Sequence, residues 1–364
     1  MAHKLALFLT SLCFAAPAFS QRVACIGPPF ANGAIADARQ SFEAALQWRL
    51  SAEHTVRCFA SHDESAETWH PHVLVSAGRD KVPPKLAAGF TGRWVDVTER
   101  LSEQRLAAER PTDPFVADRL AAVVAEALTG VRPRVTTTPL PSPEHRAAAA
   151  GWGRGSWWDQ HQGLTDFAVR NRDLEILFLG DSITQSLTGV HDRRARADGS
   201  RAFDRHFGKV AAAAFGIAGD RTQHVLFRLR QGEIASLRPR VIVLQIGINN
   251  VSADDTPADI AAGIEAIVDE LLTTQPRSHV LICGPFPAGR TTDAPARRKV
   301  ADIHAHLRRW PREELVSHLD LTALFVAADG SPRPTMAGDH LHISESGRDA
   351  WLAAISRALR RLTN

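Results

Sequence analysis

The sequence has little net charge, few cysteines and no apolar run long enough to cross a membrane, and each absence excludes a class of protein. The formal net charge is only +3 and the arginines are scattered over 364 residues, which excludes a nucleic-acid-binding protein with a basic face. The apolar run at the N-terminus, 5–16, is too short to span a bilayer, so no membrane span is expected. The apolar and charged fractions, 44% and 23%, are those of an ordinary globular protein.

The four cysteines do not form a metal-binding pattern. Cys13 lies in an N-terminal segment that we expect to be removed, and the spacing of Cys25, Cys58 and Cys283 does not resemble a zinc site. Cys25 and Cys58 lie on predicted neighbouring strands, where a disulfide could form in an oxidising compartment. The geometry between adjacent parallel strands is often poor for a disulfide, so we favour two buried thiols.

The first twenty residues have the pattern of a secretory signal peptide. His3 and Lys4 precede the apolar run, and 18–20 supplies small residues at the cleavage positions. The predicted cleavage lies near Ser20 and Gln21. We therefore expect a secreted or periplasmic protein and exclude 1–20 from the fold.

The remaining chain is long enough for two domains joined by a linker. In 21–131, alternating strands and helices predict a small parallel α/β domain with strands at 22–27, 55–59, 73–76 and 94–97 and helices at 38–50 and 115–128. The segment 132–150 is rich in Pro, Thr and Ser at its start and is predicted to be a linker. Trp152, Trp157 and Trp158 follow it, and we expect them to pin the entry segment onto the second domain rather than to stack on sugars.

The second domain, 151–364, alternates strands and helices more fully. Predicted strands are 176–179, 210–215, 241–246, 280–283 and 316–321, with helices that include 257–273 and 345–362. Right-handed crossovers then give a three-layer α/β/α sandwich around a five-stranded parallel sheet of flavodoxin-like order.

The loops at the carboxyl ends of these strands contain the parts of an acyl-transfer site, and reactive groups gather at that edge of such sheets. Ser182 follows the first strand, Gly219 the second and Asn249 the third, while Asp339 and His342 precede the last helix. A serine becomes nucleophilic when an imidazole takes its proton and a carboxylate orients the imidazole. Fixed N–H donors stabilise the oxyanion.

Four blocks in this order resemble those of the SGNH or GDSL hydrolase superfamily: Gly180-Asp181-Ser182, Gly219, Gly247-x-Asn249 and Asp339-x-x-His342. Within it, 215–229 and 263–268 are most similar to catalytic subunits of the intracellular platelet-activating-factor acetylhydrolase type.

The resemblance implies a role for each site residue. Ser182 is the implied nucleophile, His342 the base and Asp339 its orienter; Ser182, Gly219 and Asn249 are the implied oxyanion donors. No cofactor and no metal are implied. The chain departs from the superfamily at Asn250, where most members have Asp but the acetylhydrolase-like group has Asn, and from that group at Phe227, where Trp is usual.

The first domain resembles a truncated copy of the same fold whose nucleophile is lost. Its first strand leads into Gly27-Pro28-Pro29, which offers no hydroxyl, and no histidine precedes its last helix. The stretch 77–94 is too short for a helix, a strand and a second helix, so one strand is predicted to be missing. An unrelated small α/β domain is the alternative. In either case we expect it to be non-catalytic and to dock on the esterase domain or to bind substrate.

The sequence thus predicts a secreted serine esterase that hydrolyses small acyl esters, above all acetyl esters, with acetylated glycans as expected substrates. The alternatives are a lysophospholipase or thioesterase of the same fold and a non-catalytic carbohydrate-binding protein. His304 and His306 would diverge on a helix, which argues against a metal site there.

Overall fold

A computed structural model describes residues 21–26, 30, 39, 41–50, 54–59, 65–77, 82–103, 114–130, 135–144, 146, 152, 155–310 and 314–362. The chain divides into two compact units, Met1–Val131 and Arg132–Asn364, which we treat separately. The predicted signal peptide and Gly27-Pro28-Pro29 lie outside the described residues.

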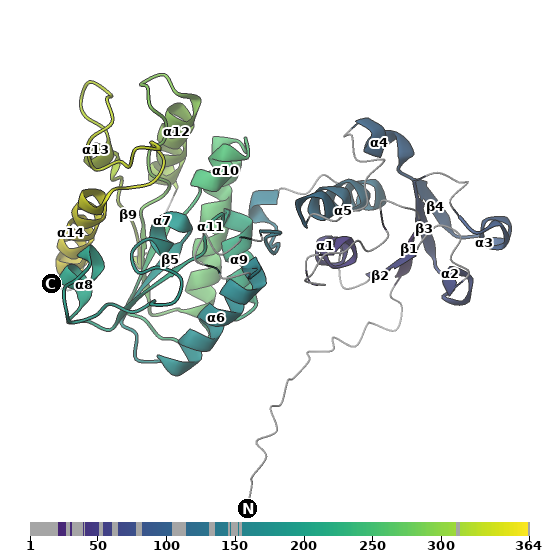
Figure 1. Cartoon of the computed structure of the whole chain (residues 1–364), viewed down its shortest axis with the longest axis horizontal. Helices are drawn as coiled ribbons and strands as arrows, with labels where there is room; N and C mark the ends of the chain where they lie inside the picture. Colours follow the sequence, from purple (N-terminus) through teal and green to yellow (C-terminus); the bar gives the residue numbers. More distant parts are fainter. Residues whose placement is uncertain are drawn as a thin grey trace, which may run out of the picture. The chain divides into compact units, whose positions relative to one another are not determined.

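The first unit contains a four-stranded parallel sheet. Its strands are β1 (Gln21–Ile26), β2 (His54–Phe59), β3 (Val73–Ser76) and β4 (Arg93–Asp96), in the order β2-β1-β3-β4. Helices α1 (Phe42–Arg49) and α5 (Pro114–Thr129) cover one face, and α2 (Ser65–Thr68) and α3 (Pro84–Gly89) lie on the other, while α4 (Thr98–Glu103) follows β4 (Figure 1). The predicted parallel α/β architecture of this region is confirmed.

Cys25 and Cys58 are register partners on β1 and β2. Both are free, as is Cys283, so the expectation of two thiols in the first unit is confirmed, although Cys25 is buried and Cys58 only half-buried. Burial, together with the neighbouring Cys25 thiol, raises the pKa of Cys58 well above its usual value, which keeps this thiol protonated and unreactive.

The second unit contains the predicted five-stranded parallel sheet. Its strands are β5 (Ile176–Gly180), β6 (Ala212–Gly216), β7 (Val241–Gln245), β8 (His279–Ile282) and β9 (Val316–His318), in the order β6-β5-β7-β8-β9. This confirms the flavodoxin-like order. The four strands of the first unit have the same order as the first four strands of the second unit. Among the described residues, the stretch 77–94 contains a single helix, α3, and no fifth strand follows β4.

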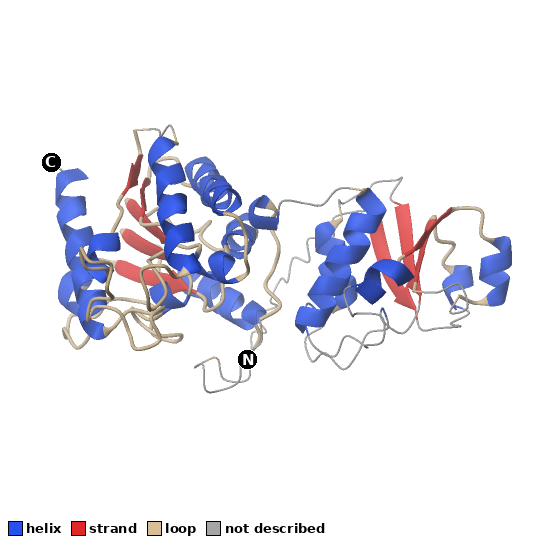
Figure 2. Cartoon of the chain, turned by 90° about the horizontal axis from the view of Figure 1, so that it is seen from above, coloured by secondary structure: helices blue, strands red, loops and turns tan. Residues whose placement is uncertain are grey.

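Helices cover both faces of this sheet (Figure 2). They are α6 (Trp157–Arg170), α7 (Ser182–Gln185), α8 (Ala202–Phe207), α9 (Thr222–Arg230), α10 (Ile248–Ser252), α11 (Pro257–Thr274), α12 (Pro295–Arg309), α13 (Thr322–Phe325) and α14 (Glu345–Leu362). Phe178 of β5 contacts α8 and α14: its ring centroid lies 5.3 Å from Phe203 and 5.9 Å from Trp351. Burying each such ring contributes about 2–3 kcal/mol to folding. Among the helices of the described ranges, none is both long and apolar enough to cross a membrane.

Residues 135–144 differ from the expectation of a free linker. The 3₁₀ turn η4 (Val135–Thr137) packs on α9 and α11, and the carbonyl of Thr136 accepts a hydrogen bond from Thr222 Oγ1 at 3.0 Å. The buried Leu140 donates its N–H to Gln223 O at 3.2 Å. These residues belong to the second unit because their backbone polar groups find partners there.

The entry segment continues into buried aromatic packing. The carbonyl of Glu144 accepts the N–H of Trp157 at 2.8 Å, and the side chains of Trp152 and Trp157 are buried. The expectation that these two tryptophans pin the segment is therefore confirmed.

Candidate active site

Three of the predicted site residues follow neighbouring strands at one edge of the sheet. Ser182 begins α7 directly after β5, Gly219 lies in the turn after β6, and Asn249 lies in α10 after β7. Because β5 pairs with both β6 and β7, the turn that carries Ser182 lies between the other two. Parallel pairing thus gathers residues that are far apart in the sequence.

The backbone around Ser182 requires a close approach of two strands. A Cβ on Gly180 would overlap the carbonyl oxygen of Gln245 on β7, so only glycine fits there. Asp181 then caps α7, with Oδ1 accepting the Ile183 N–H at 3.0 Å. Burial raises the pKa of Asp181 to about 7, although the Ile183 N–H and the nearby His342 oppose the rise. Ser182 therefore follows directly on a buried carboxyl group whose pKa is raised toward neutrality by burial.

Ser182, His342 and Asp339 form a continuous hydrogen-bonded chain. Ser182 Oγ lies 3.0 Å from His342 Nε2, and His342 Nδ1 lies 2.6 Å from Asp339 Oδ2. With the carboxylate accepting a proton from Nδ1, the unprotonated Nε2 is free to accept the serine proton. The structure thus brings together side chains that lie up to 160 positions apart in the sequence.

The Asp339 carboxylate is held ionised by its neighbours. Its Oδ1 accepts the N–H groups of Leu341 and His342 at 3.1 and 2.9 Å. Partial desolvation raises the pKa of Asp339, but the hydrogen bonds from the His342 ring and these two amides outweigh it and bring the pKa to about 2. The carboxylate is therefore charged at every pH at which the protein is expected to work.

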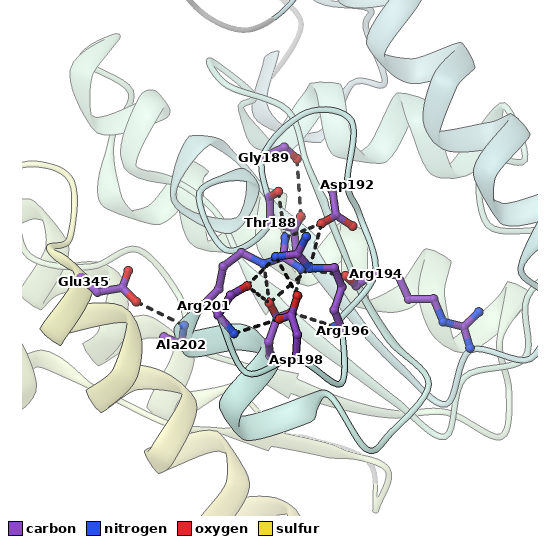
Figure 3. Close-up of polar contacts among 11 residues, drawn as sticks. Thr188, Gly189, Asp192, Arg194, Arg196, Asp198, Arg201, Ala202 and Glu345 are labelled. Carbon is purple, nitrogen blue, oxygen red and sulfur yellow. Dashed lines mark hydrogen bonds and ion pairs between the residues drawn. The ribbon is translucent and has the colours of Figure 1, made fainter.

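The loop that carries Asp339 and His342 is fixed on both sides. Met336 pairs with Ile343 in an antiparallel bridge, and the Ala337 N–H donates to the His342 carbonyl at 2.8 Å. Just beyond the loop, Glu345 accepts the N–H of Ala202 at 3.2 Å (Figure 3). The start of α14 is thereby tied to the start of α8.

The segment before α8 is cross-linked around the buried carboxylate of Asp204. Arg201 donates to both of its oxygens, each at 2.7 Å, and also to the carbonyls of Thr188 and Arg194 at 3.0 Å (Figure 3 shows this cluster). Desolvation raises the pKa of Asp204, but the bonds from Arg201 and from the Arg196 N–H overcome it and bring the pKa to about 2. Glu345 is thus attached to a rigid segment, which limits movement of the neighbouring His342 loop.

The turn after β6 is held by side chains from α7 and α10, the helices that follow β5 and β7. Gly219 adopts a φ of +85°, a conformation that favours glycine. The Ala218 N–H donates to Gln185 Oε1 at 3.0 Å, and Asn249 Nδ2 donates to the carbonyl of Asp220 at 2.8 Å. The two predicted oxyanion donors, Gly219 and Asn249, are therefore linked through the backbone of Asp220, the residue after Gly219.

Beneath this turn lies a buried charged cluster. Arg228 Nε lies 3.3 Å from Asp220 Oδ2, and its Nη1 lies 3.4 Å from Glu233 Oε1. Glu233 Oε2 contacts His161 Nδ1 at 2.7 Å, and Asp220 Oδ1 accepts the Trp157 Nε1–H at 2.6 Å. Burial raises the pKa of Asp220, while the Arg228 guanidinium and the Trp157 N–H oppose that rise.

Replacing Arg228 with alanine is expected to lower the free energy of unfolding by about 3–5 kcal/mol, because two buried acids would lose their cationic partner. The side chains of Arg228, Asp220 and Glu233 are fully shielded from solvent, so water cannot replace the guanidinium. Urea denaturation at neutral pH measures the loss.

Arg230→Ala is the matched control for that prediction. Arg230 lies two residues on in the same helix and pairs with Glu270 at 3.0 Å, but half of its side chain is exposed. An exposed pair contributes less than about 1 kcal/mol. Equal losses in the two variants would contradict the assignment of the buried cluster as a stabilising core.

The two departures from the resemblance have packing explanations. The buried Asn250 accepts the Thr222 N–H at 2.9 Å and donates to Asp255 Oδ2 at 2.9 Å, so it joins α9 to the loop before α11. Phe227 packs against two adjacent indoles, with centroids 5.9 Å from Trp157 and 5.4 Å from Trp158.

The sequence did not reveal the buried polar residues that support the site, chiefly Gln185, Gln245 and the cluster of Asp220, Arg228 and Glu233. Gln245 is buried at the end of the apolar strand β7, and its Oε1 accepts a hydrogen bond from Thr184 Oγ1 at 3.1 Å. A polar side chain within an apolar run was the available signal, both for Gln245 and for Arg228 within α9. Periodicity alone could not name their partners.

Two of the other histidines that the sequence singles out, His304 and His306, lie on α12, and His340 lies in the loop of Asp339. His304 is buried and contacts His318 Nε2 at 2.9 Å and the carbonyl of Pro285 at 3.0 Å, whereas His306 is exposed. The two therefore diverge on α12, as predicted. His340 lies in the same loop as Asp339 with a positive φ of 54°.

Comparison with known proteins agrees with this arrangement. Residues 178–350 match the GDSL-like Lipase/Acylhydrolase family. Platelet-activating factor acetylhydrolase IB subunit alpha2 of Rattus norvegicus is 33% identical over 196 residues, which cover 54% of this chain and 80% of that protein. The alpha1 subunit of the same species is 32% identical over 214 residues, which cover 58% and 85%.

Solved structures give more distant similarities. An acetylxylan esterase from Geobacillus stearothermophilus is 20% identical, with a TM-score of 0.43, and the match covers 50% of this chain and 93% of that one. A lipase from a goat rumen metagenome is 15% identical, with a TM-score of 0.40, and the match covers 51% and 97%. The identity and coverage of the acetylhydrolase subunits, together with the family match over the strands and loops of the second unit, show that this chain belongs to the GDSL-like lipase/acylhydrolase family.

Proposed function

We propose that the second unit is a serine esterase that removes small acyl groups, above all acetyl, through an acyl-enzyme intermediate. The observation that carries the proposal is the chain of contacts from Ser182 Oγ to His342 Nε2, at 3.0 Å, and from His342 Nδ1 to Asp339 Oδ2, at 2.6 Å. Nucleophilic serine catalysis needs this order of groups and these distances.

The first half of the reaction follows from the positions of these groups. Ser182 Oγ attacks the ester carbonyl while His342 Nε2 takes the hydroxyl proton, and Asp339 stabilises the resulting imidazolium. The oxyanion accepts hydrogen bonds from the backbone N–H groups of Ser182 and Gly219 and from the Asn249 side chain. When the intermediate collapses, His342 returns the proton to the departing alcohol and the acyl group remains on Ser182.

The second half repeats the first with water as the attacking group. His342 takes a proton from water, and the hydroxide attacks the acyl carbonyl. Collapse of the second tetrahedral intermediate releases the carboxylic acid and restores the Ser182 hydroxyl with the proton held by His342.

Two observations support a small acyl group on a large polar alcohol. The relatives of the second unit are named acetylhydrolases. The side chains of His342 and Asp339 are 41% and 51% exposed, so the side from which the alcohol departs is open to solvent. An acetylated glycan is the substrate class that we favour, in line with the predicted secretory signal.

We infer further that the first unit is non-catalytic and is a degenerate relative of the second. Its four described strands have the order of the first four strands of the second sheet, and the sequence Gly27-Pro28-Pro29 that follows β1 contains no hydroxyl. All ester hydrolysis should then depend on Ser182.

A series of p-nitrophenyl esters tests the acyl preference. We expect kcat/KM to be highest for acetate and to fall by about tenfold or more by butyrate, because added methylenes no longer fit the site. Release of acetate from acetylated xylan, measured beside a Ser182→Ala blank, extends the test to glycans. Highest activity on octanoate or longer esters would overturn the acetyl assignment and favour a lipase or thioesterase. A folded wild-type protein that hydrolyses none of the esters would favour a binding role.

A further inference from the structure

Asp220 lies between the two donors that we assign to the oxyanion hole. It follows Gly219 directly, so the two residues share a peptide group. Its carbonyl oxygen also accepts the Asn249 Nδ2–H at 2.8 Å. A displacement of this one residue would therefore move both donors together, although they belong to loops that follow different strands.

The side chain of Asp220 is completely buried. Its Oδ1 accepts the Trp157 Nε1–H at 2.6 Å, and its Oδ2 lies 3.3 Å from Arg228 Nε. Burial of a carboxyl group is costly unless it is hydrogen-bonded or paired, so these contacts specify the orientation of the residue. Asp220 does not act as the cap of α9, because the residue before that helix is Arg221, whose N–H donates to His224 Nδ1 at 3.1 Å.

The partners of Asp220 are themselves fixed from a second direction. Arg228 also contacts Glu233 at 3.4 Å, and Glu233 contacts His161 at 2.7 Å. His161 lies one helical turn after Trp157 on α6, and the two rings stack with centroids 5.4 Å apart. The chain of contacts therefore starts and ends on α6, which lies outside the residues 178–350 that match the family.

We propose that Asp220 is the positioning residue of the oxyanion hole and that α6, through the Trp157 N–H and the Arg228 pair, holds it in place. This inference rests on the proposed esterase function. It assigns a role in the reaction to a helix that contributes no group that touches the substrate. Loss of the Trp157 contact would leave substrate binding intact but misalign the donors in the transition state.

Trp157→Phe is the sharpest variant, because it keeps an aromatic ring in place and removes the indole N–H that donates to Asp220 Oδ1. We expect kcat on p-nitrophenyl acetate to fall about tenfold with KM unchanged, less than for deletion of an oxyanion donor, because the donors are displaced and not removed. Affinity for a boronic acid, which forms a tetrahedral adduct with the serine, should fall by the same factor. Asp220→Ala should act in the same way and lower kcat by about 100-fold.

Trp158→Phe is the matched control. It removes an indole N–H from the adjacent position of α6, where the ring packs edge-on against Phe227 with centroids 5.4 Å apart. We expect kcat, KM and boronate affinity to remain at wild-type values. A Trp157→Phe protein that matches Trp158→Phe, or whose loss lies in KM, would overturn the proposal. If Asp220→Ala does not fold, Trp157→Phe still decides the question.

A measurement without substrate separates this inference from the esterase assignment. Hydrogen exchange of the Gly219 amide and of the Asn249 side-chain amide, followed by NMR, should accelerate in Trp157→Phe and remain unchanged in Trp158→Phe. Failure of the esterase proposal would appear as a wild type that hydrolyses no ester. Unchanged exchange in Trp157→Phe would overturn the positioning role whether or not the wild type is active.

Discussion

Replacing Ser182 with alanine is expected to abolish ester hydrolysis, lowering kcat on p-nitrophenyl acetate by about 10⁴-fold or more. Ser182 Oγ is the atom that lies 3.0 Å from His342 Nε2, and alanine removes it without altering the turn. The backbone N–H of residue 182 and the Asn249 side chain remain, so substrate binding should persist. Stopped-flow or steady-state assays of purified protein measure the loss.

Ser186→Ala serves as the control for that experiment. Ser186 lies at the end of α7, one helical turn after Ser182, and its Oγ donates to the Ile183 carbonyl at 2.7 Å. Its loss should leave kcat within about threefold of wild type, since a surface-helix hydroxyl bond contributes only about 1 kcal/mol. Substantial activity in Ser182→Ala would show that another nucleophile operates and would reopen the first unit as its source.

The second large effect is expected for Asp339→Asn, with kcat reduced by about 10³–10⁴-fold. The asparagine amide can donate to His342 Nδ1, which stabilises the tautomer that carries its proton on Nε2. That nitrogen then cannot accept the Ser182 proton. KM should change little because Asp339 does not contact the acyl group in the proposed mechanism.

The pH dependence gives this prediction a second readout. The pKa of Asp339 is about 2, below its ordinary value, so its carboxylate stays ionised down to that pH. A lowered pKa in the folded state adds stability above the unfolded pKa and loses it as the pH falls through about 2. Asp339 should therefore not be the group whose protonation ends activity in mildly acidic buffers. If the wild-type kcat falls in mildly acidic buffers and this fall is absent in Asp339→Asn, Asp339 would be the group that titrates, and the prediction would be wrong.

Asp329→Asn is the matched control. Asp329 lies ten residues earlier in the same connection between α13 and α14, and it caps an exposed turn through the Ser331 N–H at 2.9 Å. Its amide variant should retain wild-type kcat. Equal losses in Asp329→Asn and Asp339→Asn would indicate a general effect on the loop instead of a change of the His342 tautomer.

Secondary structure was predictable wherever the conformation of a residue depends on its neighbours in the sequence. The predicted strand 73–76 and helix 345–362 agree with β3 and α14 to the residue. Boundaries failed where a side chain competes with the backbone. The first helix begins at Phe42 and not at residue 38, because Ser41 caps it by accepting the Ala44 N–H. The strand expected over 316–321 ends at His318, before Asp320 accepts the Thr322 N–H and starts α13.

The gathering of Ser182, Gly219, Asn249, Asp339 and His342 was also predictable, because parallel strands of known order place their carboxyl ends at one edge. Their chemical roles stay predictions for the variants above to test. The support beneath them was not predictable. Trp157 and Asp220 are 63 positions apart, and no periodicity indicates that an indole from one helix should hold a carboxylate from a distant turn.

By itself the sequence determined the α/β architecture, the strand order of the second unit and which side chains meet at its edge, since these follow from local hydrophobic patterns and from the handedness of crossovers. Only the tertiary structure decided that residues 135–144 pack on the second unit and that Arg228 lies between Asp220 and Glu233. Buried polar groups must find partners wherever the folded chain supplies them, so their pairing depends on the whole packing and not on the sequence around each one.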